Sequence, residues 1–247
     1  MALLAGKTAV ITGGARGLGA AIATSMAAEK AHVVVVDRNS DAALELVAHI
    51  NGSGGSASPE ILDIGDRDAV KAFGERMLGQ YQQIDVLVNN AGIAPRIRPQ
   101  DPDQMDKWDQ VVSINLTAQW DITVSLLPGL KHPGASVIFL SSIAGFSAPR
   151  SSAAYGATKA AVRSLVQYFA RDLGPTGGRA NGLAPGRMKS DLMTVTGAAG
   201  DKFIQRLPLG RVGETEEIVG PAIFLASDMS SYVTGVTIPV DGGYLAL

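Results

Sequence analysis

The sequence contains no cysteine among its 247 residues. Disulfide bonds, thiolate catalysis and iron–sulfur clusters are therefore excluded. Histidine is scarce too, because only His32, His49 and His132 are present. They are scattered without the spacing of metal ligands, so we expect no metal site.

Neither sign of charge is in large excess, since 21 basic and 23 acidic side chains give a net charge of −2. This balance predicts no nucleic-acid partner. No apolar run approaches the length of a membrane span, so we expect no membrane partner. The first residues, "MALLAGK", form an apolar run that is too short for a signal peptide, and they lack its basic start. A soluble cytoplasmic protein is the simplest interpretation.

What the chain has instead is hydrophobic residues, at 46%, and 29 glycines. Near-continuous apolar, β-branched runs predict strands that are buried on both faces, as in parallel sheets. These runs lie at 7–12, 32–37, 84–90 and 136–142. Helical patterns lie between them, at 18–30, 40–50, 66–79, 104–127 and 152–173. The alternation predicts one α/β domain over residues 1–247, a doubly wound parallel sheet of about seven strands with helices on both faces.

The polar stretch "NGSGGSAS" (51–58) looks like a linker. We interpret it as the turn between a helix and a third strand, "PEILD" (59–63), because that strand-like run follows at once. The last strand is expected at 235–241.

A glycine-rich turn, "TGGARGLG" (12–19), follows the first strand and opens the first helix. Gly13 permits a tight turn, Gly17 lets the backbone approach a pyrophosphate, and Gly19 allows close packing of helix and strand. The amino terminus of the helix offers free N–H groups to phosphate. The alternative is a turn that merely favours glycine.

Asp37 ends the second strand, where a carboxylate can accept hydrogen bonds from both hydroxyls of an adenosine ribose and repel a 2′-phosphate. Its alternative role is that of a turn-forming or capping residue. Arg16 and Arg38 are both positioned to meet a 2′-phosphate instead. Asp63, at the end of the third strand, is expected near the adenine ring unless it only caps the strand.

Tyr155 and Lys159 stand four positions apart in "SAAYGATKA" (152–160), so they share one face of a helix. The pair by itself fits an interface tyrosine and a solvated lysine. An unperturbed phenol has a pKa near ~10. A neighbouring ammonium would favour its phenolate and make Tyr155 a general acid/base.

Two further polar residues are candidates for the same site. Ser142 ends the fifth strand, where its hydroxyl would hold a substrate oxygen, or else cap the strand. Asn115 lies on an apolar stripe, and a buried amide must find hydrogen-bond partners, so a structural role competes with a catalytic one. The stripe comprises Trp108, Val111, Val112, Asn115, Leu116 and Gln119.

The order and spacing of these motifs resemble the short-chain dehydrogenase/reductase family over essentially the whole chain. "TGGARGLG" resembles its TGxxxGxG turn, and "YGATK" its YxxxK motif. The matches continue in "NNAG" (89–92), in "SIN" ending at Asn115, in "PG" (185–186) and in "VDGG" (240–243). Ser142 precedes Tyr155 by thirteen positions, the usual separation of that family's catalytic serine and tyrosine.

The resemblance implies a Rossmann-like fold and hydride transfer between a nicotinamide cofactor and a secondary alcohol or ketone. It implies that Asn115, Ser142, Tyr155 and Lys159 are catalytic. Lys159 would also hydrogen-bond the nicotinamide ribose, and Asn115 would hold a water that links Lys159 to solvent. Cofactor contacts are expected from Gly13, Arg16, Gly17, Leu18, Gly19, Asp37, Asp63, Ile64, Asn90, Ala91, Gly92, Tyr155, Lys159, Pro185, Gly186, Met188 and Ser190.

Asp37 favours NAD over NADP as the cofactor. The resemblance, together with the apolar tail "YLAL" (244–247), predicts a homotetramer. Two residues depart from the family pattern. Ala180 replaces the more usual valine, so its strand is expected to form and pack less strongly than most. Arg187 is charged where many relatives are apolar.

The substrate is expected to be a small and moderately hydrophobic molecule. Residues 187–207 are interpreted as a lid over it. Candidate substrate contacts are Ala94, Pro95, Ile143, Ala144, Pro149, Leu192 and Met193. One alternative function is reduction of a 3-oxoacyl group on a carrier protein, whose acidic surface would meet Arg187, Lys189, Lys202 and Arg206. A cofactor-binding regulator without catalysis is the other, although all four catalytic positions are filled.

Overall fold

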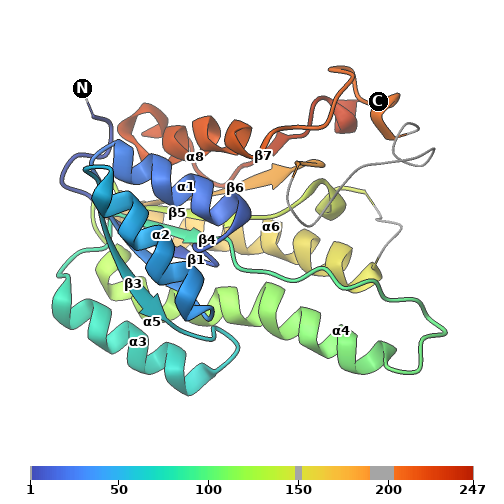
Figure 1. Ribbon diagram of the computed structural model, residues 1–247, viewed down its shortest axis with the longest axis horizontal. Helices are drawn as coiled ribbons and strands as arrows, with labels where there is room; N and C mark the ends of the chain where they lie inside the picture. Colours follow the sequence, from blue (N-terminus) through green and yellow to red (C-terminus); the bar gives the residue numbers. More distant parts are fainter. Residues whose placement is uncertain (1, 148–151, 190–202, 247) are drawn as a thin grey trace.

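The computed structural model describes residues 2–147, 152–189 and 203–246. Its centre is a seven-stranded sheet in which all neighbouring strands are parallel (Figure 1). The strand order is β3-β2-β1-β4-β5-β6-β7. The strands are β1 (Thr8–Thr12), β2 (His32–Asp37), β3 (Ser56–Ile61), β4 (Val86–Asn89), β5 (Ser136–Leu140), β6 (Arg179–Pro185) and β7 (Thr237–Val240). The predicted doubly wound parallel sheet is confirmed.

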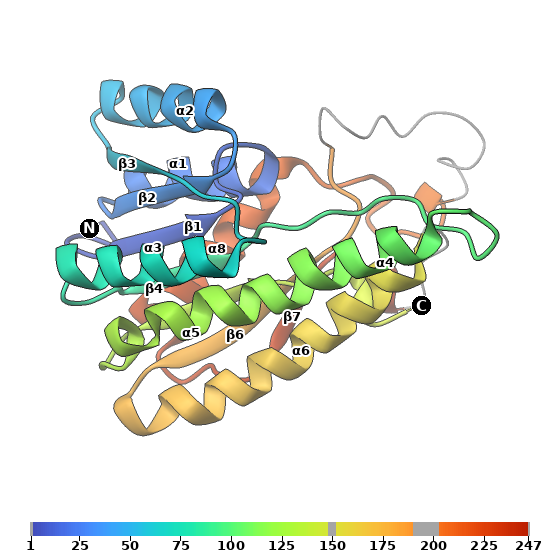
Figure 2. The ribbon, with the colours of Figure 1, turned by 90° about the horizontal axis from the view of Figure 1, so that it is seen from below.

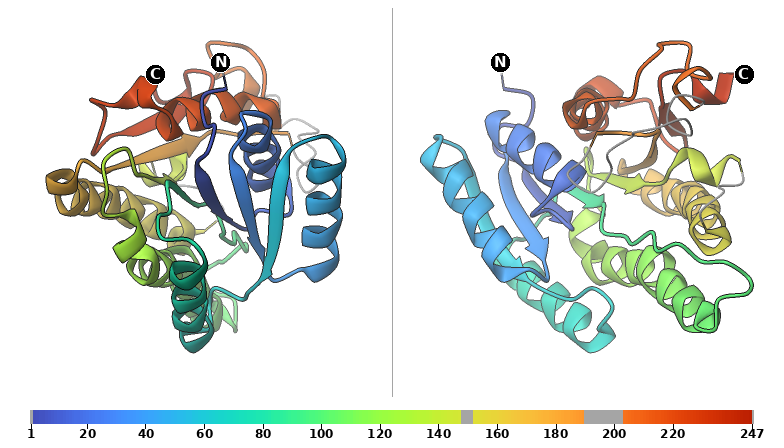
Figure 3. Two further views of the ribbon diagram at one scale, coloured as in Figure 1. Left: turned by 90° about the vertical axis from the view of Figure 1, so that its left-hand side faces the viewer. Right: turned by 45° about the vertical axis from the view of Figure 1, so that its right-hand side comes forward.

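Helices cover both faces of the sheet (Figures 1 and 2). On one face lie α1 (Gly17–Ala28), α2 (Ser40–Gly52) and α8 (Val219–Ala226). On the other lie α3 (Arg67–Gln80), α5 (Ala118–Leu130) and α6 (Ala153–Leu173), with α4 (Gln104–Val112) preceding α5. Figure 3 shows the same layers in two further orientations.

The valines of β2 show why the strand runs are so uniformly apolar. Val33 and Val35 contribute to the core under α1 and α2, while Val34 and Val36 contribute to the core on the opposite face. Successive side chains of a strand point to opposite faces. A strand buried on both faces therefore needs apolar residues at every position.

The third strand begins earlier than the sequence predicts. Ser56–Ile61 pairs with β2 over six residues, so Ser56 and Ser58 lie in the strand and Asp63 lies beyond it. The Asn51 amide donates to the Ala57 carbonyl oxygen at 3.0 Å and accepts from the Ala57 N–H at 2.7 Å. Pairing with β2 and this side-chain link turn a polar stretch into an edge strand.

The predicted helix over 104–127 is interrupted. A π-helical turn, Ser113–Thr117, separates α4 from α5. The predicted apolar stripe is only partly buried, because Trp108 is 37% exposed while Val111 and Asn115 are fully buried. π-turns are frequent at functional sites.

The expectation that β6 packs weakly is wrong. All seven of its residues are buried, including Ala180, because β6 lies between β5 and β7. Tertiary pairing on both edges outweighs the low strand propensity of alanine. Within the described residues, no helix combines the length and apolar character needed to cross a membrane.

Candidate functional site

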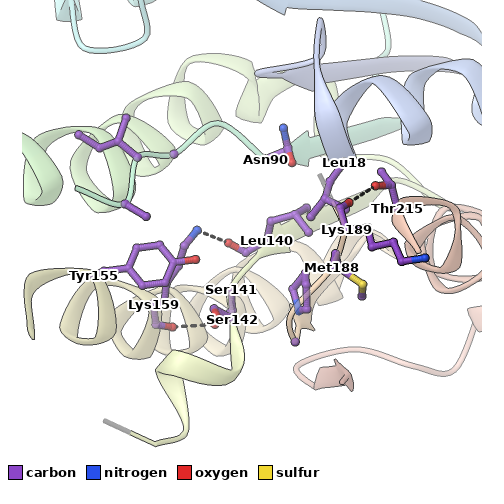
Figure 4. A pocket seen from close by; sticks show the side chains of 15 residues that line it. Leu18, Asn90, Leu140, Ser141, Ser142, Tyr155, Lys159, Met188, Lys189 and Thr215 are labelled. Atoms are coloured by element: carbon purple, nitrogen blue, oxygen red, sulfur yellow. Dashed lines mark hydrogen bonds between the residues drawn. The ribbon is translucent and has the colours of Figure 1, made fainter. Parts of the chain in front are cut away.

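The carboxyl ends of the central strands surround a cavity of about 250 Å³ (Figure 4). The strand order reverses between β1 and β4, and open α/β sheets bind ligands at such a switch point. The lining residues are Leu18, Asn90, Gly92, Ile93, Ala94, Leu140, Ser141, Ser142, Tyr155, Lys159, Pro185, Gly186, Met188, Lys189 and Thr215.

The glycine turn between β1 and α1 forms one rim of this edge. Gly13 and Gly17 adopt positive φ angles of 59° and 53°. A Cβ on Gly19 would collide with the Gly13 carbonyl oxygen and lie 2.6 Å from Nδ2 of Asn90. A Cβ on Gly17 would meet no atom within 4 Å, so open space lies beside the backbone at the start of α1. These features fit a pyrophosphate bound at a helix amino terminus.

Asn90 joins the end of β4 to the glycine turn. Its Nδ2 donates to the carbonyl oxygens of Thr12 at 3.0 Å and Gly13 at 2.9 Å. The Thr12 hydroxyl accepts from the backbone N–H groups of Asn90 and Ala91. The "NNAG" motif therefore holds the turn in shape, and Gly92 continues into the cavity wall.

Asp37 lies at the carboxyl end of β2, beside the glycine turn. Its Oδ2 accepts from the Ala15 N–H at 3.2 Å and its Oδ1 from the Asn39 N–H at 3.0 Å. The carboxylate is thus oriented by backbone amides on both sides. Arg16 and Arg38 are exposed.

The two residues expected at the adenine differ in burial. Asp63 is exposed, and its Oδ1 accepts from the Gly65 N–H at 2.9 Å. Ile64 is 7% exposed and belongs to the hydrophobic core under α3 and α5. Neither residue lines the cavity.

Tyr155 lies in the first turn of α6, close to Ser142 (Figure 4). Ser142 does not end the strand as expected, because β5 ends at Leu140 and the Ser142 hydroxyl accepts from the Ala144 N–H at 3.1 Å in the following turn. The Ser152 hydroxyl accepts from the Tyr155 N–H at 3.2 Å and caps the helix. Burial raises the pKa of the Tyr155 phenol, and hydrogen bonding to Ser142 opposes that shift. The net shift is therefore upward, opposite to the lowering expected from Lys159, because desolvation of the phenolate is its largest cause.

Lys159 is held at both ends by Leu140, the last residue of β5, and by Ser141, which follows it. Its Nζ donates to the Leu140 carbonyl oxygen at 2.6 Å, and the Ser141 hydroxyl donates to the Lys159 carbonyl oxygen at 2.8 Å. The side chain is buried, and desolvation lowers its pKa from 10.5 to about 8. Its Nζ also lies 5.8 Å from the centroid of the Tyr155 ring.

Asn115, in the π-helical turn, is fully buried and fully paired. Its Oδ1 accepts from the Ile93 N–H and its Nδ2 donates to the Ile93 carbonyl oxygen, both at 2.8 Å. A Cβ on Gly92 would lie 3.2 Å from Oδ1 of Asn115 and 3.6 Å from Nζ of Lys159. The amide therefore anchors the chain after β4 beside Lys159, which is the structural role weighed above.

The cavity is closed on the side of β6 by Pro185, Gly186 and Met188. Of the candidate substrate contacts, Ala94 lines the cavity, whereas Pro95, Ile143 and Ala144 do not. Pro149, Ser190, Leu192, Met193 and most of the predicted lid over 187–207 lie outside the described residues.

Sequence reasoning missed four lining residues, Ile93, Leu140, Ser141 and Thr215, and it named Lys189 only as a possible contact of a carrier protein. The available signal for three of these residues was their position next to a motif: this holds for Ile93, Ser141 and Lys189. Thr215 had no such signal, because it comes to the cavity from a distant part of the chain.

The residues at this edge fit a dinucleotide, on the evidence of the open space at Gly17 and the oriented Asp37 carboxylate. A metal has no comparable support. Across the part of the chain that the structure describes, no group of three or more His, Asp and Glu side chains is arranged to hold an ion.

The known proteins that this chain is similar to carry the names of reductases and dehydrogenases. Residues 13–245 match a family model described as enoyl-(acyl carrier protein) reductase. The chain is 36% identical to the 3-oxoacyl-[acyl-carrier-protein] reductase FabG of Thermotoga maritima, covering 97% of this chain and 98% of the relative. It is 37% identical to trans-4-hydroxycyclohexanecarboxylate dehydrogenase of Sinomonas cyclohexanicum, covering 98% and 94%.

Among solved structures, one similar protein is described as an NAD(P)-dependent gluconate 5-dehydrogenase from Beutenbergia cavernae, with bound NADP at low occupancy. Its TM-score is 0.93 at 36% identity, and the match covers 99% of this chain and 98% of that one.

Proposed function

The chain belongs to the short-chain dehydrogenase/reductase family, and from that premise we propose that Tyr155 is the general acid/base in hydride transfer between NAD(H) and a secondary alcohol or its ketone. The observation that carries the proposal is the convergence of Tyr155, Ser142 and Lys159 on one cavity at the switch point of the sheet.

Each of these residues has a distinct task. In ketone reduction the Tyr155 phenol donates its proton to the carbonyl oxygen, and in alcohol oxidation the phenolate accepts it back. The Ser142 hydroxyl orients the substrate oxygen toward Tyr155. The Lys159 ammonium, beside the Tyr155 ring, stabilises the phenolate while it exists. The nicotinamide, when bound, supplies or accepts the hydride.

We assign the cofactor site to the glycine turn, Asp37, Asn90 and the segment after β6. Gly17 leaves room for the pyrophosphate, and Asp37 is oriented for the adenosine ribose. We propose NAD over NADP, since the Asp37 carboxylate would face the charge of a 2′-phosphate. The similar structure with bound NADP makes this preference worth a direct measurement.

Ile93, Ala94, Leu140 and Met188 line the cavity together with polar residues that include Ser142, Tyr155 and Lys159. This mixture favours a moderately hydrophobic substrate that carries an oxygen for the polar groups to bind. One relative is named for a hydroxycyclohexanecarboxylate, so cyclic secondary alcohols are the first compounds to test. Turnover of a panel of cyclic and open-chain ketones with NADH tests the proposal. Absence of turnover with every ketone, in protein that binds the cofactor, would favour the non-catalytic regulator.

Reduction of a carrier-bound 3-oxoacyl group remains the second candidate, because a 36% identical relative carries that name. The basic patch it would use is partly occupied by the chain itself. Lys189 pairs with Glu214, and the guanidinium groups of Arg187 and Arg206 lie over the rings of Phe203 and Tyr244. Binding to immobilised acyl carrier protein, and a preference for its thioester over the free ketone, would support this candidate.

A further inference from the structure

The segment after β6 is joined to a distant part of the chain at the cavity wall. The Lys189 N–H donates to the Gly213 carbonyl oxygen at 2.8 Å, and the Gly213 N–H donates to the Arg187 carbonyl oxygen at 3.0 Å. These two bonds form an isolated parallel bridge between Met188 and Gly213. We call this contact the 188–213 bridge.

Side chains on both segments reinforce the 188–213 bridge. The Thr215 hydroxyl donates to the Lys189 carbonyl oxygen at 2.6 Å (Figure 4). The Lys189 ammonium pairs with the Glu214 carboxylate. This ion pair is exposed and so contributes little, which leaves the hydrogen bonds to join the two segments.

Met188 has empty space on two sides. It lines the catalytic cavity, and it also lines a second cavity of about 160 Å³. A flexible side chain that borders two cavities has room to adopt more than one rotamer. Something else must hold Met188, which is only 9% exposed.

The backbone at Gly213 holds the side chain of Met188 in place. A Cβ on Gly213 would collide with Sδ of Met188 and lie 3.3 Å from its Cε. The φ angle of Gly213 is not in the positive range, so close approach of Met188, and not backbone conformation, accounts for the glycine. The sulfur of Met188 therefore rests directly against the backbone of residue 213.

We propose that Gly213 is a positioning residue, which seats Met188 and thereby sets the cavity wall against which the nicotinamide end of the cofactor rests. This inference depends on the cofactor site proposed above, in which Pro185, Gly186 and Met188 meet the nicotinamide. The adenosine end lies at Asp37, which does not line this cavity, although Leu18 at the end of the glycine turn lines it together with Met188 and Thr215. Disturbing the seat should therefore weaken binding of the nicotinamide half much more than binding of the adenosine half.

The test compares NADH with ADP-ribose, which lacks the nicotinamide, by titration calorimetry on the whole protein. Gly213→Ala displaces Met188, and we expect its Kd for NADH to rise about tenfold, because the displaced side chain changes the wall at the nicotinamide end. Its Kd for ADP-ribose should stay within about twofold of wild type, since the adenosine contacts are untouched. Gly220→Ala is the matched control, because a Cβ there meets nothing within 4 Å, and it should change neither Kd.

A double variant tests the mechanism of the effect. The collision requires both side chains, so Gly213→Ala should add no further loss of NADH affinity once Met188→Ala is present. If Gly213→Ala does not fold, Thr215→Val removes the Lys189 hydrogen bond at nearly constant volume. It should raise the Kd for NADH by about threefold, with ADP-ribose unaffected.

Several results would overturn the inference. One is unchanged NADH affinity in Gly213→Ala, and another is an equal loss for NADH and ADP-ribose, which indicates a general structural effect. Additive losses in the double variant would contradict the seating of Met188. Wild-type protein that binds neither NADH nor ADP-ribose would instead overturn the proposed function.

Discussion

At the scale of single residues, Tyr155 provides the clearest prediction. Tyr155→Phe keeps the ring that packs in the first turn of α6 but removes the proton that must move. We expect kcat to fall by a factor of about a thousand or more, in the range typical of a lost general acid/base. The Kd for NADH should change little. A variant that retains a tenth of wild-type kcat in a steady-state assay would show that another group transfers the proton.

Lys159 allows a prediction in which stability and activity move in opposite directions. Lowering of its pKa from 10.5 to about 8 by burial corresponds to a cost on the order of 3 kcal/mol to the fold at pH 7. Lys159→Met removes the buried charge, so we expect the free energy of unfolding at pH 7 to rise by about 2 kcal/mol while turnover is lost.

The pH dependence of that difference follows from the direction of the shift. Below about pH 8 the lysine is protonated in both the folded and unfolded states, so the wild type bears the full penalty. Between about pH 8 and 10.5 the folded lysine loses its proton first, so the penalty shrinks as pH rises. Urea unfolding at pH 7 and pH 9.5 should show a smaller advantage of Lys159→Met at the higher pH. A constant difference would show that lost packing or hydrogen bonding, and not charge burial, governs the variant.

Asp37 determines the proposed cofactor preference. Asp37→Ala removes the charge that would face a 2′-phosphate, so kcat/KM with NADP(H) should rise relative to NAD(H) by about tenfold or more. Some loss with both cofactors is expected, because the carboxylate also accepts from the Ala15 and Asn39 N–H groups. A wild-type preference for NADP(H), or no shift in the variant, would assign the choice to Arg16 and Arg38.

At the scale of elements, the π-helical turn Ser113–Thr117 positions Asn115 toward the chain that follows β4. Asn115→Leu leaves the part-buried N–H and C=O of Ile93 without their side-chain partner, so we expect a loss of about 1–3 kcal/mol in unfolding free energy. Ser113→Ala, on the exposed side of the same turn, is the control and should cost less than about 0.5 kcal/mol. Lost activity with unchanged stability would instead favour a role in the reaction alone.

At the scale of the whole molecule, we propose the homotetramer that the resemblance implies. The tail offers less support than expected, because Tyr244 stacks on Phe203 of the same chain with ring centroids 5.1 Å apart. Other apolar side chains are more exposed: Trp120 and Val124 on α5 are 37% and 40% exposed, and Tyr168 on α6 is 53% exposed. An apolar surface of this kind indicates an interface.

Sedimentation equilibrium should give four times the 25.5 kDa of one chain, and Trp120→Glu should shift the protein toward smaller species. Leu44→Glu, an equally apolar exposed position on α2, is the control and should leave the assembly unchanged. A wild-type monomer at micromolar concentration would contradict the tetramer.

The sequence by itself determined the class of fold and the edge at which the site lies. Uniform valine runs such as that of β2 predict a sheet buried on both faces, because burial demands apolar residues at each position. The spacing of Gly13, Gly17 and Gly19, and of Tyr155 and Lys159, is local, so a turn or a helix is enough to interpret it.

Tertiary structure decided what depends on partners from distant parts of the chain. Pairing with β2 set the start of β3 at Ser56. Pairing with β5 and β7 buried β6, although the alanine at position 180 has a low strand propensity. Desolvation raised the pKa of Tyr155, which the adjacent lysine alone would have lowered. Thr215 reaches the cavity, and Gly213 reaches Met188 in the cavity wall, from a distant part of the chain, and no local pattern marks either residue. Burial and long-range contact are properties of the packed molecule, so motif spacing carries no measure of them.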